Sequence, residues 1–176
     1  VLRSFDRKRI LRQRDPLQVA WIGLLEEFVC CAEHGDTMDK VVAGHVLWLV
    51  FARSRHADSQ FILQEPAVDG RYCEAETRRT KTSNRHGTRR RQHFLAAPAN
   101  GVTGNDWCNE WLATRSRMGL KASEDQPLLP VPLSGGRWSS AAVDGFEVGL
   151  HMRSLLIKLG VDAAQVSNVG SHSCKC

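Results

Sequence analysis

Residues 38–55 restrict the fold more than any other segment, because on a helix they are apolar on almost every side. A surface helix has one apolar stripe and one polar face, whereas this segment has almost no polar face. It must be surrounded by other parts of the chain, so we expect a central core helix that Asp36 or Thr37 caps. We expect His45 to be a buried structural histidine within it. The apolar residues are Val41, Val42, Val46, Trp48, Leu49 and Phe51.

The end of this helix carries charged residues that an apolar helix does not need. Arg53, Arg55 and Asp58 follow one another closely in the sequence. Charged groups next to a buried element are costly unless a partner satisfies them. Two explanations stay open here: a binding site, or a plain structural ion pair between Arg55 and Asp58.

Three further helices are predicted around the central one. The first opens at Asp15-Pro16, an N-cap followed by proline at the first helical position, and ends at Gly35. The second begins at Gly104 or Asn105 and ends at Gly119. The third is capped by Ser139 or Ser140 and reaches Leu159. The residues expected to face inward from the third helix are Phe146, Leu150, Leu155 and Leu156.

Two candidate strands, residues 72–80 and 93–97, flank a segment with turn-forming residues such as Asn84 and Gly87. We therefore predict an α+β fold that is mainly α, with a helical core and one small antiparallel β-sheet or hairpin. We interpret residues 1–14 as a basic linker or as the tail of a missing upstream segment. We predict that residues 15–176 form one domain that is partial at its C-terminal end.

The charge of the chain is concentrated in residues 71–91. This run has eight basic and two acidic residues, a net charge of +6, whereas residues 1–70 sum to −1 and residues 92–176 to zero. Like charges packed this closely favour a polyanionic partner. The alternative is a solvated loop. His86 and His93 are expected to face solvent. The candidate DNA-binding arginines are Arg78, Arg79, Arg85, Arg89, Arg90 and Arg91.

Several functional classes are not favoured. No apolar run approaches the roughly 18 residues that a membrane-spanning helix needs. The start of the chain is charged from Arg3 onward, unlike a signal peptide, so we expect an intracellular protein with reduced thiols. The six cysteines contain no C-x-x-C pair, and no metal or other cofactor is predicted.

Three motifs in order resemble the catalytic domain of the tyrosine recombinases, the phage-integrase family. The segment Arg55-His56-Ala57-Asp58 matches the family's arginine motif at the end of a buried helix. Thr80-Lys81-Thr82 matches the lysine on the following β-hairpin. His172-Ser173-Cys174-Lys175 matches the family's His-x-x-Arg, with lysine in place of arginine. The resemblance covers about residues 17–176 and is closest to the integrases of eukaryotic mobile elements, which implies a nuclear location.

The resemblance implies a role for each matched residue. Arg55, or alternatively Arg53, would bind the phosphate through its planar guanidinium, and Asp58 would hold a nearby group. Lys81 would be the general acid that protonates the leaving 5′ oxygen. His172 would be a phosphate ligand or a proton carrier. Lys175 would replace the second arginine as a point charge.

The resemblance also implies a tyrosine nucleophile near the C-terminus of the family's domain. The only tyrosine in this chain is Tyr72, which lies before Lys81. We therefore expect a truncated domain that engages double-stranded DNA without cutting it, whose full-length relatives assemble as oligomers on DNA. Two alternatives are a non-enzymatic nucleic-acid-binding module that uses residues 71–91, and a helical domain without either activity.

Overall fold

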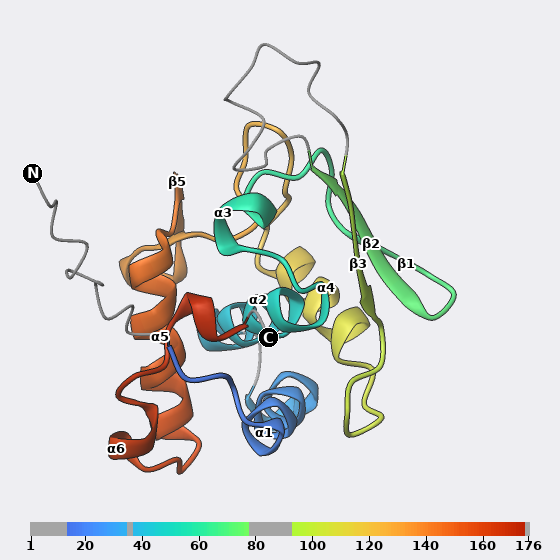
Figure 1. The fold of residues 1–176 in the computed structure, drawn as a ribbon. Helices are drawn as coiled ribbons and strands as arrows, with labels where there is room; N and C mark the ends of the chain where they lie inside the picture. The colour runs from blue at the N-terminus through green and yellow to red at the C-terminus, as the bar shows by residue number, and fades with distance from the viewer. Residues whose placement is uncertain (1–13, 35–36, 78–92, 175–176) are drawn as a thin grey trace, which may run out of the picture.

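A computed structural model describes residues 14–34, 37–77 and 93–174. Helix α2 (Met38–Phe51) runs through its centre (Figure 1), and every residue from Lys40 to Leu49 is buried. Thr37 caps the helix, because its Oγ1 accepts a hydrogen bond from the Lys40 amide at 3.2 Å. The predicted central core helix is confirmed. It ends at Phe51 rather than at Arg55, because Arg53 has a φ of 49° that a right-handed helix does not allow.

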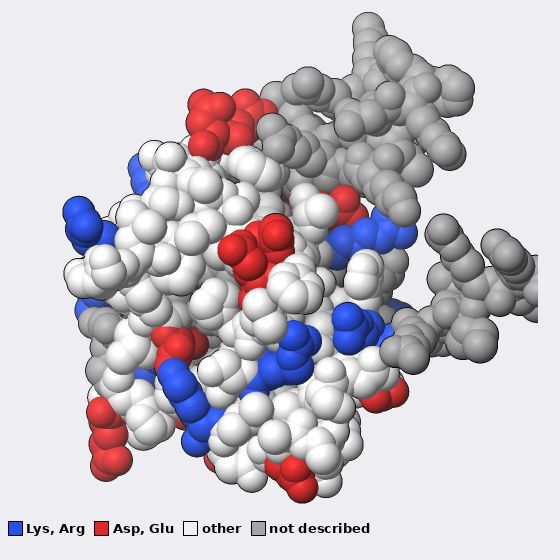
Figure 2. All heavy atoms as spheres, turned by 90° about the vertical axis from the view of Figure 1, so that its left-hand side faces the viewer, with Lys and Arg blue, Asp and Glu red and all other residues white. Residues whose placement is uncertain are grey.

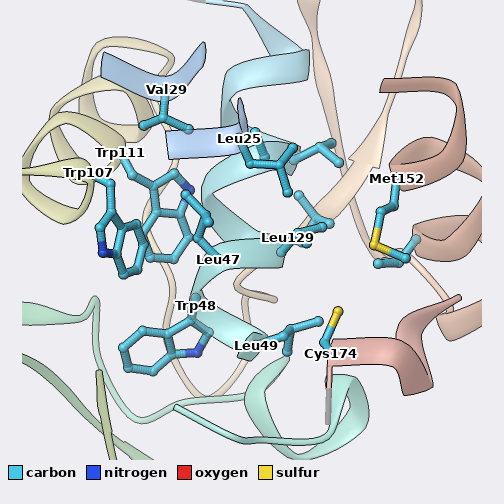
Figure 3. Packing of buried hydrophobic residues seen from close by; sticks show 14 of the residues in the cluster. Leu25, Val29, Leu47, Trp48, Leu49, Trp107, Trp111, Leu129, Met152 and Cys174 are labelled. Carbon is cyan, nitrogen blue, oxygen red and sulfur yellow. The ribbon is translucent and has the colours of Figure 1, made fainter. Parts of the chain in front are cut away.

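Three helices surround α2 (Figure 1): α1 (Val19–Cys30), α4 (Trp107–Arg117) and α5 (Gly145–Lys158). Figure 3 shows Trp107 and Trp111 of α4 on one side of α2, with Met152 of α5 and Cys174 on the other side. The rings of Trp48 and Trp111 stack with centroids 6.3 Å apart. These large aromatic side chains supply much of the apolar area that the core buries.

The strands form two separate antiparallel sheets. The first has the order β1 (Ala67–Asp69), β2 (Tyr72–Thr77) and β3 (His93–Pro98), and Thr77 pairs with His93 at the end of β2. The second pairs β4 (Pro130–Pro132) with β5 (Trp138–Ala142). The fold is therefore α+β with a small antiparallel sheet, as predicted. Neither β1 nor the second sheet was predicted from the sequence.

Five short helical segments complete the described part of the chain. They are η1 (Ala32–His34), α3 (His56–Ser59), η2 (Ser134–Gly136), α6 (Ala163–Val166) and η3 (Ser171–Cys174). Among the described residues, no helix is both long enough and apolar enough to span a bilayer.

The predicted start of the first helix was wrong. Residues 14–18 are not helical, and α1 begins at Val19. Asp15 accepts a hydrogen bond from Asn168 Nδ2 at 3.0 Å instead of capping a helix, and the Leu17 amide donates to the Ser173 carbonyl at 3.3 Å. Contacts with residues far along the chain thus override the local capping signal of Asp15-Pro16.

The predicted start of the third helix was also wrong, and its predicted inward face was correct for Leu155 and Leu156, which are buried, but not for Phe146 and Leu150. Asp144 and Glu147 form a capping box at the start of α5, and the serines at 139 and 140 belong to β5. Phe146 and Leu150 are exposed, at 67% and 46%. The buried face instead includes Gly149, where an added Cβ would lie 3.2 Å from the Gly170 Cα. This close backbone contact sets the rotation of α5, and apolar spacing alone does not reveal it.

Replacing Gly44 with alanine should destabilise the fold by about 1–3 kcal/mol, the usual cost of overpacking a core. The added Cβ would lie 2.0 Å from Trp111 Cδ1, inside the contact between α2 and α4. Urea unfolding followed by tryptophan fluorescence measures the change. The matched control is Gly23→Ala in α1, where the nearest atom is Thr103 Cγ2 at 3.3 Å and the higher helix propensity of alanine offsets a mild clash. Equal unfolding midpoints for the two variants would contradict the α2–α4 packing.

Candidate functional site

Arg55 lies at the exposed start of α3, immediately after the central helix. It is the N-cap of α3, and its carbonyl accepts hydrogen bonds from the Asp58 amide at 3.0 Å and the Ser59 amide at 3.1 Å. Within the described residues, no ion pair joins Arg55 to Asp58. The structural ion pair considered above is therefore not formed there. Arg53 is also exposed, so the geometry does not choose between the two arginines as the phosphate ligand.

Two buried histidines fix the position of α3. His56 Nε2 lies 2.8 Å from the Val143 carbonyl, and His56 Nδ1 lies 3.1 Å from His45 Nε2. A carbonyl only accepts, so His56 must donate from Nε2, and its Nδ1 must accept from His45. The chain of bonds therefore runs from α2 through α3 to the residue that precedes the N-cap of α5.

Gln60 reinforces the same junction. Its Nε2 donates to the Leu129 carbonyl at 3.0 Å and to the Val143 carbonyl at 3.1 Å, and its Oε1 accepts from the Leu129 amide at 2.8 Å. The side chain is buried and makes all three bonds to backbone. Gln60 and His56 thus tie α3 to two backbone segments that are distant in sequence.

Burial keeps both histidines neutral near pH 7. Burial, followed by the charges of His56 and Arg115, lowers the pKa of His45 well below its usual value of 6.5. Burial also lowers the pKa of His56, while its bond to the Val143 carbonyl acts in the opposite direction. His45 Nδ1 has no hydrogen-bond partner within the described residues, so a proton there would be buried without compensation.

The end of β2 is attached to the other side of α3. Thr77 Oγ1 lies within hydrogen-bond distance of two carbonyl oxygens, that of Asp58 at 2.9 Å and that of Phe61 at 3.1 Å. Thr77 is the last described residue before the basic segment, and its strand partner His93, which is exposed as predicted, is the first described residue after it. Lys81, Arg78, Arg79, Arg85, Arg89, Arg90 and Arg91, like His86, lie outside the described residues. Both ends of that segment therefore start from a strand pair bonded to α3.

His172 lies on η3, next to the start of α5. It is exposed, whereas the neighbouring Ser173 and Cys174 are buried. A Cβ added at Gly145 would lie 3.2 Å from Ser171 Oγ and 3.9 Å from His56 Cδ2. The residue before His172 and the residue after Arg55 therefore approach the same point at the start of α5. Lys175 lies outside the described residues.

Two arginines that were not proposed from the sequence lie near His172. Arg14, Arg153 and His172 line one hollow of about 300 Å³. Arg153 lies within the helical pattern of α5, and a cation beside the buried Met152 was the signal that could have identified it. Arg14 had been assigned only to the basic tail.

The most buried cation of the described structure is committed to the fold. Arg115 has no exposed surface, and its guanidinium donates to both carboxylate oxygens of Glu65 and to the Leu128 carbonyl. It also lies over the Trp111 ring, 5.3 Å from the centroid. Three of its five N–H donors are used, and the group has no exposed surface through which a ligand could reach the other two.

No known family model, curated protein or solved structure matches this chain. Within the part of the chain that the structure describes, no three His, Cys, Asp or Glu side chains gather as metal ligands would.

The stability of the fold should fall as the pH drops below about 6.5, the ordinary histidine value. His45 and His56 have lowered pKa values in the folded chain, so the unfolded chain takes up protons at a higher pH. The stabilisation is complete above about 6.5 and is lost below it, by up to about 1.4 kcal/mol per pH unit for each proton that only the unfolded chain binds. Urea unfolding between pH 7.5 and 5 measures this slope.

Substituting His45→Gln should flatten the slope, because it removes the more strongly shifted group and keeps a side-chain N–H donor. The control His93→Gln changes an exposed histidine and should leave the slope as it is. If the slope is the same in all three proteins, the buried pair is not its source.

Proposed function

We propose that this chain is a DNA-binding domain of the tyrosine-recombinase type that holds a backbone phosphate at the exposed start of α3. The observation that carries the proposal is the position of α3. Thr77, at the base of the basic segment, lies within hydrogen-bond distance of the Asp58 carbonyl, and the turn that carries His172 meets His56 at Gly145. The three motifs are far apart in sequence, and this junction supports their convergence.

The proposed chemistry follows from the residue types. Arg55 presents a guanidinium without a protein partner in the described structure, and its planar donors match two oxygens of a phosphodiester. Lys81 would donate a proton to the leaving oxygen, and His172 would bind a further phosphate oxygen or carry a proton. Fixed cations at one phosphate stabilise the charge that develops on its oxygens. Lys175 would add charge without the donor fork of arginine.

The single tyrosine does not fit the role of nucleophile. Tyr72 is the first residue of β2, whereas Thr77, which contacts α3, is the last. Five residue steps at roughly 3.3 Å each separate the two by about 16 Å. We therefore propose that these 176 residues bind DNA without forming a phosphotyrosyl bond.

A non-enzymatic nucleic-acid-binding module is the second candidate. The observation that favours it is the net charge of +6 in residues 71–91, which is sufficient for sequence-independent phosphate contacts without any reacting centre. In that case the exposed Arg55 would take no part in binding.

Arg55→Gln should weaken the binding of a short DNA duplex by about fivefold to tenfold, which is the loss of one charged phosphate contact. Fluorescence anisotropy over a salt series measures the affinity. The slope of the logarithm of the binding constant against the logarithm of the salt concentration should become shallower by about one, which corresponds to one fewer ion released. Arg137→Gln removes the same charge from an exposed arginine near β5 and is the matched control. If Arg55→Gln behaves like this control while replacing Arg89, Arg90 and Arg91 abolishes binding, the second candidate is correct. No binding at low salt would exclude both.

A nicked suicide duplex that traps phosphotyrosyl products should give no covalent adduct with this chain. The measurement is a denaturing gel with labelled DNA, and Tyr72→Phe is the control for any band that appears. An adduct that Tyr72→Phe abolishes would overturn the proposal that Tyr72 is not a nucleophile.

A further inference from the structure

The hollow beside His172 has a cationic lining and a glycine floor. Arg14, Arg153, Ser171 and His172 supply its polar groups, and none of the described residues that line it is a carboxylate. Its volume of about 300 Å³ is at the lower end of the range for small-molecule sites. Gly149 and Gly170 are buried, and an added Cβ at Gly149 would lie 3.2 Å from the Gly170 Cα. The absence of side chains at these positions lets the backbone of α5 and of the 169–171 turn meet beneath the hollow.

Arg153 is held in place by one end of its guanidinium. Its Nη1 donates to the Val169 carbonyl at 2.6 Å. Within the described residues it has no carboxylate partner, in contrast to Arg117 with Glu110 and Lys158 with Asp39. The guanidinium has five N–H donors, so the bond to Val169 leaves most of them available on an oriented group.

Arg14 approaches from the segment before α1. Its Nε and Cζ lie 3.5 and 3.8 Å from a Cβ built on Gly170, so the guanidinium lies against the backbone of the turn before η3. The contacts of Asp15 with Asn168 and of Leu17 with Ser173 hold this segment there. Two guanidinium groups from distant parts of the chain thus reach the same hollow, and neither has a carboxylate partner within the described residues.

The nearest acidic groups of α5 are already used in capping. Asp144 Oδ1 accepts hydrogen bonds from the Phe146 and Glu147 amides at 2.7 Å, and Glu147 Oε2 accepts from the Asp144 amide at 3.0 Å. Figure 2 shows that basic and acidic side chains alternate over the face that contains α5 and α6. Among the described residues, the positive charge at the hollow is therefore local and is not part of a broad cationic surface.

We infer that this hollow is a phosphate-binding site in which Arg14 and Arg153 hold one phosphate group, with Ser171 and His172 at its edge. Planar guanidinium forks match the oxygens of a phosphate, and a hydroxyl adds one further donor. The inference goes beyond the proposed function, because it assigns ligand binding to two arginines outside the Arg55, Lys81 and His172 set. The phosphate belongs either to a DNA backbone or to a small free phosphate.

Inorganic phosphate titrated into the ¹⁵N-labelled chain at low ionic strength tests the site directly. The amide signals of Gly170 and Ser171 should shift in a saturable way. Arg14→Gln should weaken this binding about tenfold, the usual effect of losing one charged hydrogen bond. Arg153→Lys keeps the charge, loses the fork and should weaken binding as well. Arg137→Gln should leave it unchanged.

The outcomes separate the alternatives. No saturable shift up to about 10 mM phosphate, a concentration that would nearly saturate a site of millimolar affinity while the ionic strength stays low, would overturn the site. An equal loss with Arg137→Gln would also overturn it, because the effect would then come from net charge alone. Circular dichroism and urea unfolding of each variant identify any loss that arises from misfolding. Arg14→Gln is expected to keep the fold, because Arg14 lies against the Gly170 backbone without a hydrogen bond among the described residues.

A duplex-binding assay with the same variants identifies the source of the phosphate. If the ligand is a DNA backbone, Arg14→Gln weakens duplex binding, and the slope of its logarithmic salt dependence becomes shallower by about one. If duplex binding is unchanged while phosphate binding is lost, the ligand is a small phosphate. If the chain binds inorganic phosphate but not DNA, this site is supported and the proposed function is wrong. If Arg55→Gln weakens DNA binding but the chain does not bind inorganic phosphate, the proposed function is supported and this site is wrong.

Discussion

The burial of α2 on all sides is the constraint on which the rest of the structure depends. A helix with no solvent-facing side cannot use water to satisfy a polar residue in its interior. His45 is such a residue, and its partner has to come from the protein. His56 supplies that partner and passes the hydrogen bond on to the Val143 carbonyl. The core therefore dictates where α3 lies.

The position of Arg55, the proposed DNA contact, depends on where α3 lies. A helix of one turn such as α3 has no stability of its own in water, because helix nucleation is unfavourable. Its place is fixed by bonds to α2, to the segment before α5 and to Thr77 at the end of β2. Arg55 is exposed, yet its backbone begins a short helix that these bonds hold to three other parts of the fold. An exposed cation on a rigid support is what binding a phosphate in a defined orientation requires.

The sequence was sufficient where a local pattern agreed with the tertiary structure. The apolar segment around Trp48 predicted α2, and the strands on either side of the basic run begin where they were predicted, although residues 78–80 of the first lie outside the described residues. Prediction from the sequence failed where contacts between residues distant in the chain determine where a helix begins. Asp15-Pro16 is a good helix start, but Asp15 bonds to Asn168. Asp144 and Glu147 have the spacing of a capping box, which could have been recognised in the sequence, but the serines before them were predicted as the helix cap instead.

The candidate site shows the same division. Arg55, Lys81 and His172 were proposed from the order of motifs, whereas the His45–His56 pair and the meeting of Arg14 with Arg153 depend on which segments pack together. No local pattern distinguishes Arg115 from Arg153, since both are arginines on helices with an apolar face. The fold gives Arg115 a carboxylate and a carbonyl that occupy its guanidinium, and it gives Arg153 a single carbonyl. Whether an arginine stabilises the protein or is available to a ligand is thus decided by the acceptors that distant residues bring to it, and these become known only when the chain is folded.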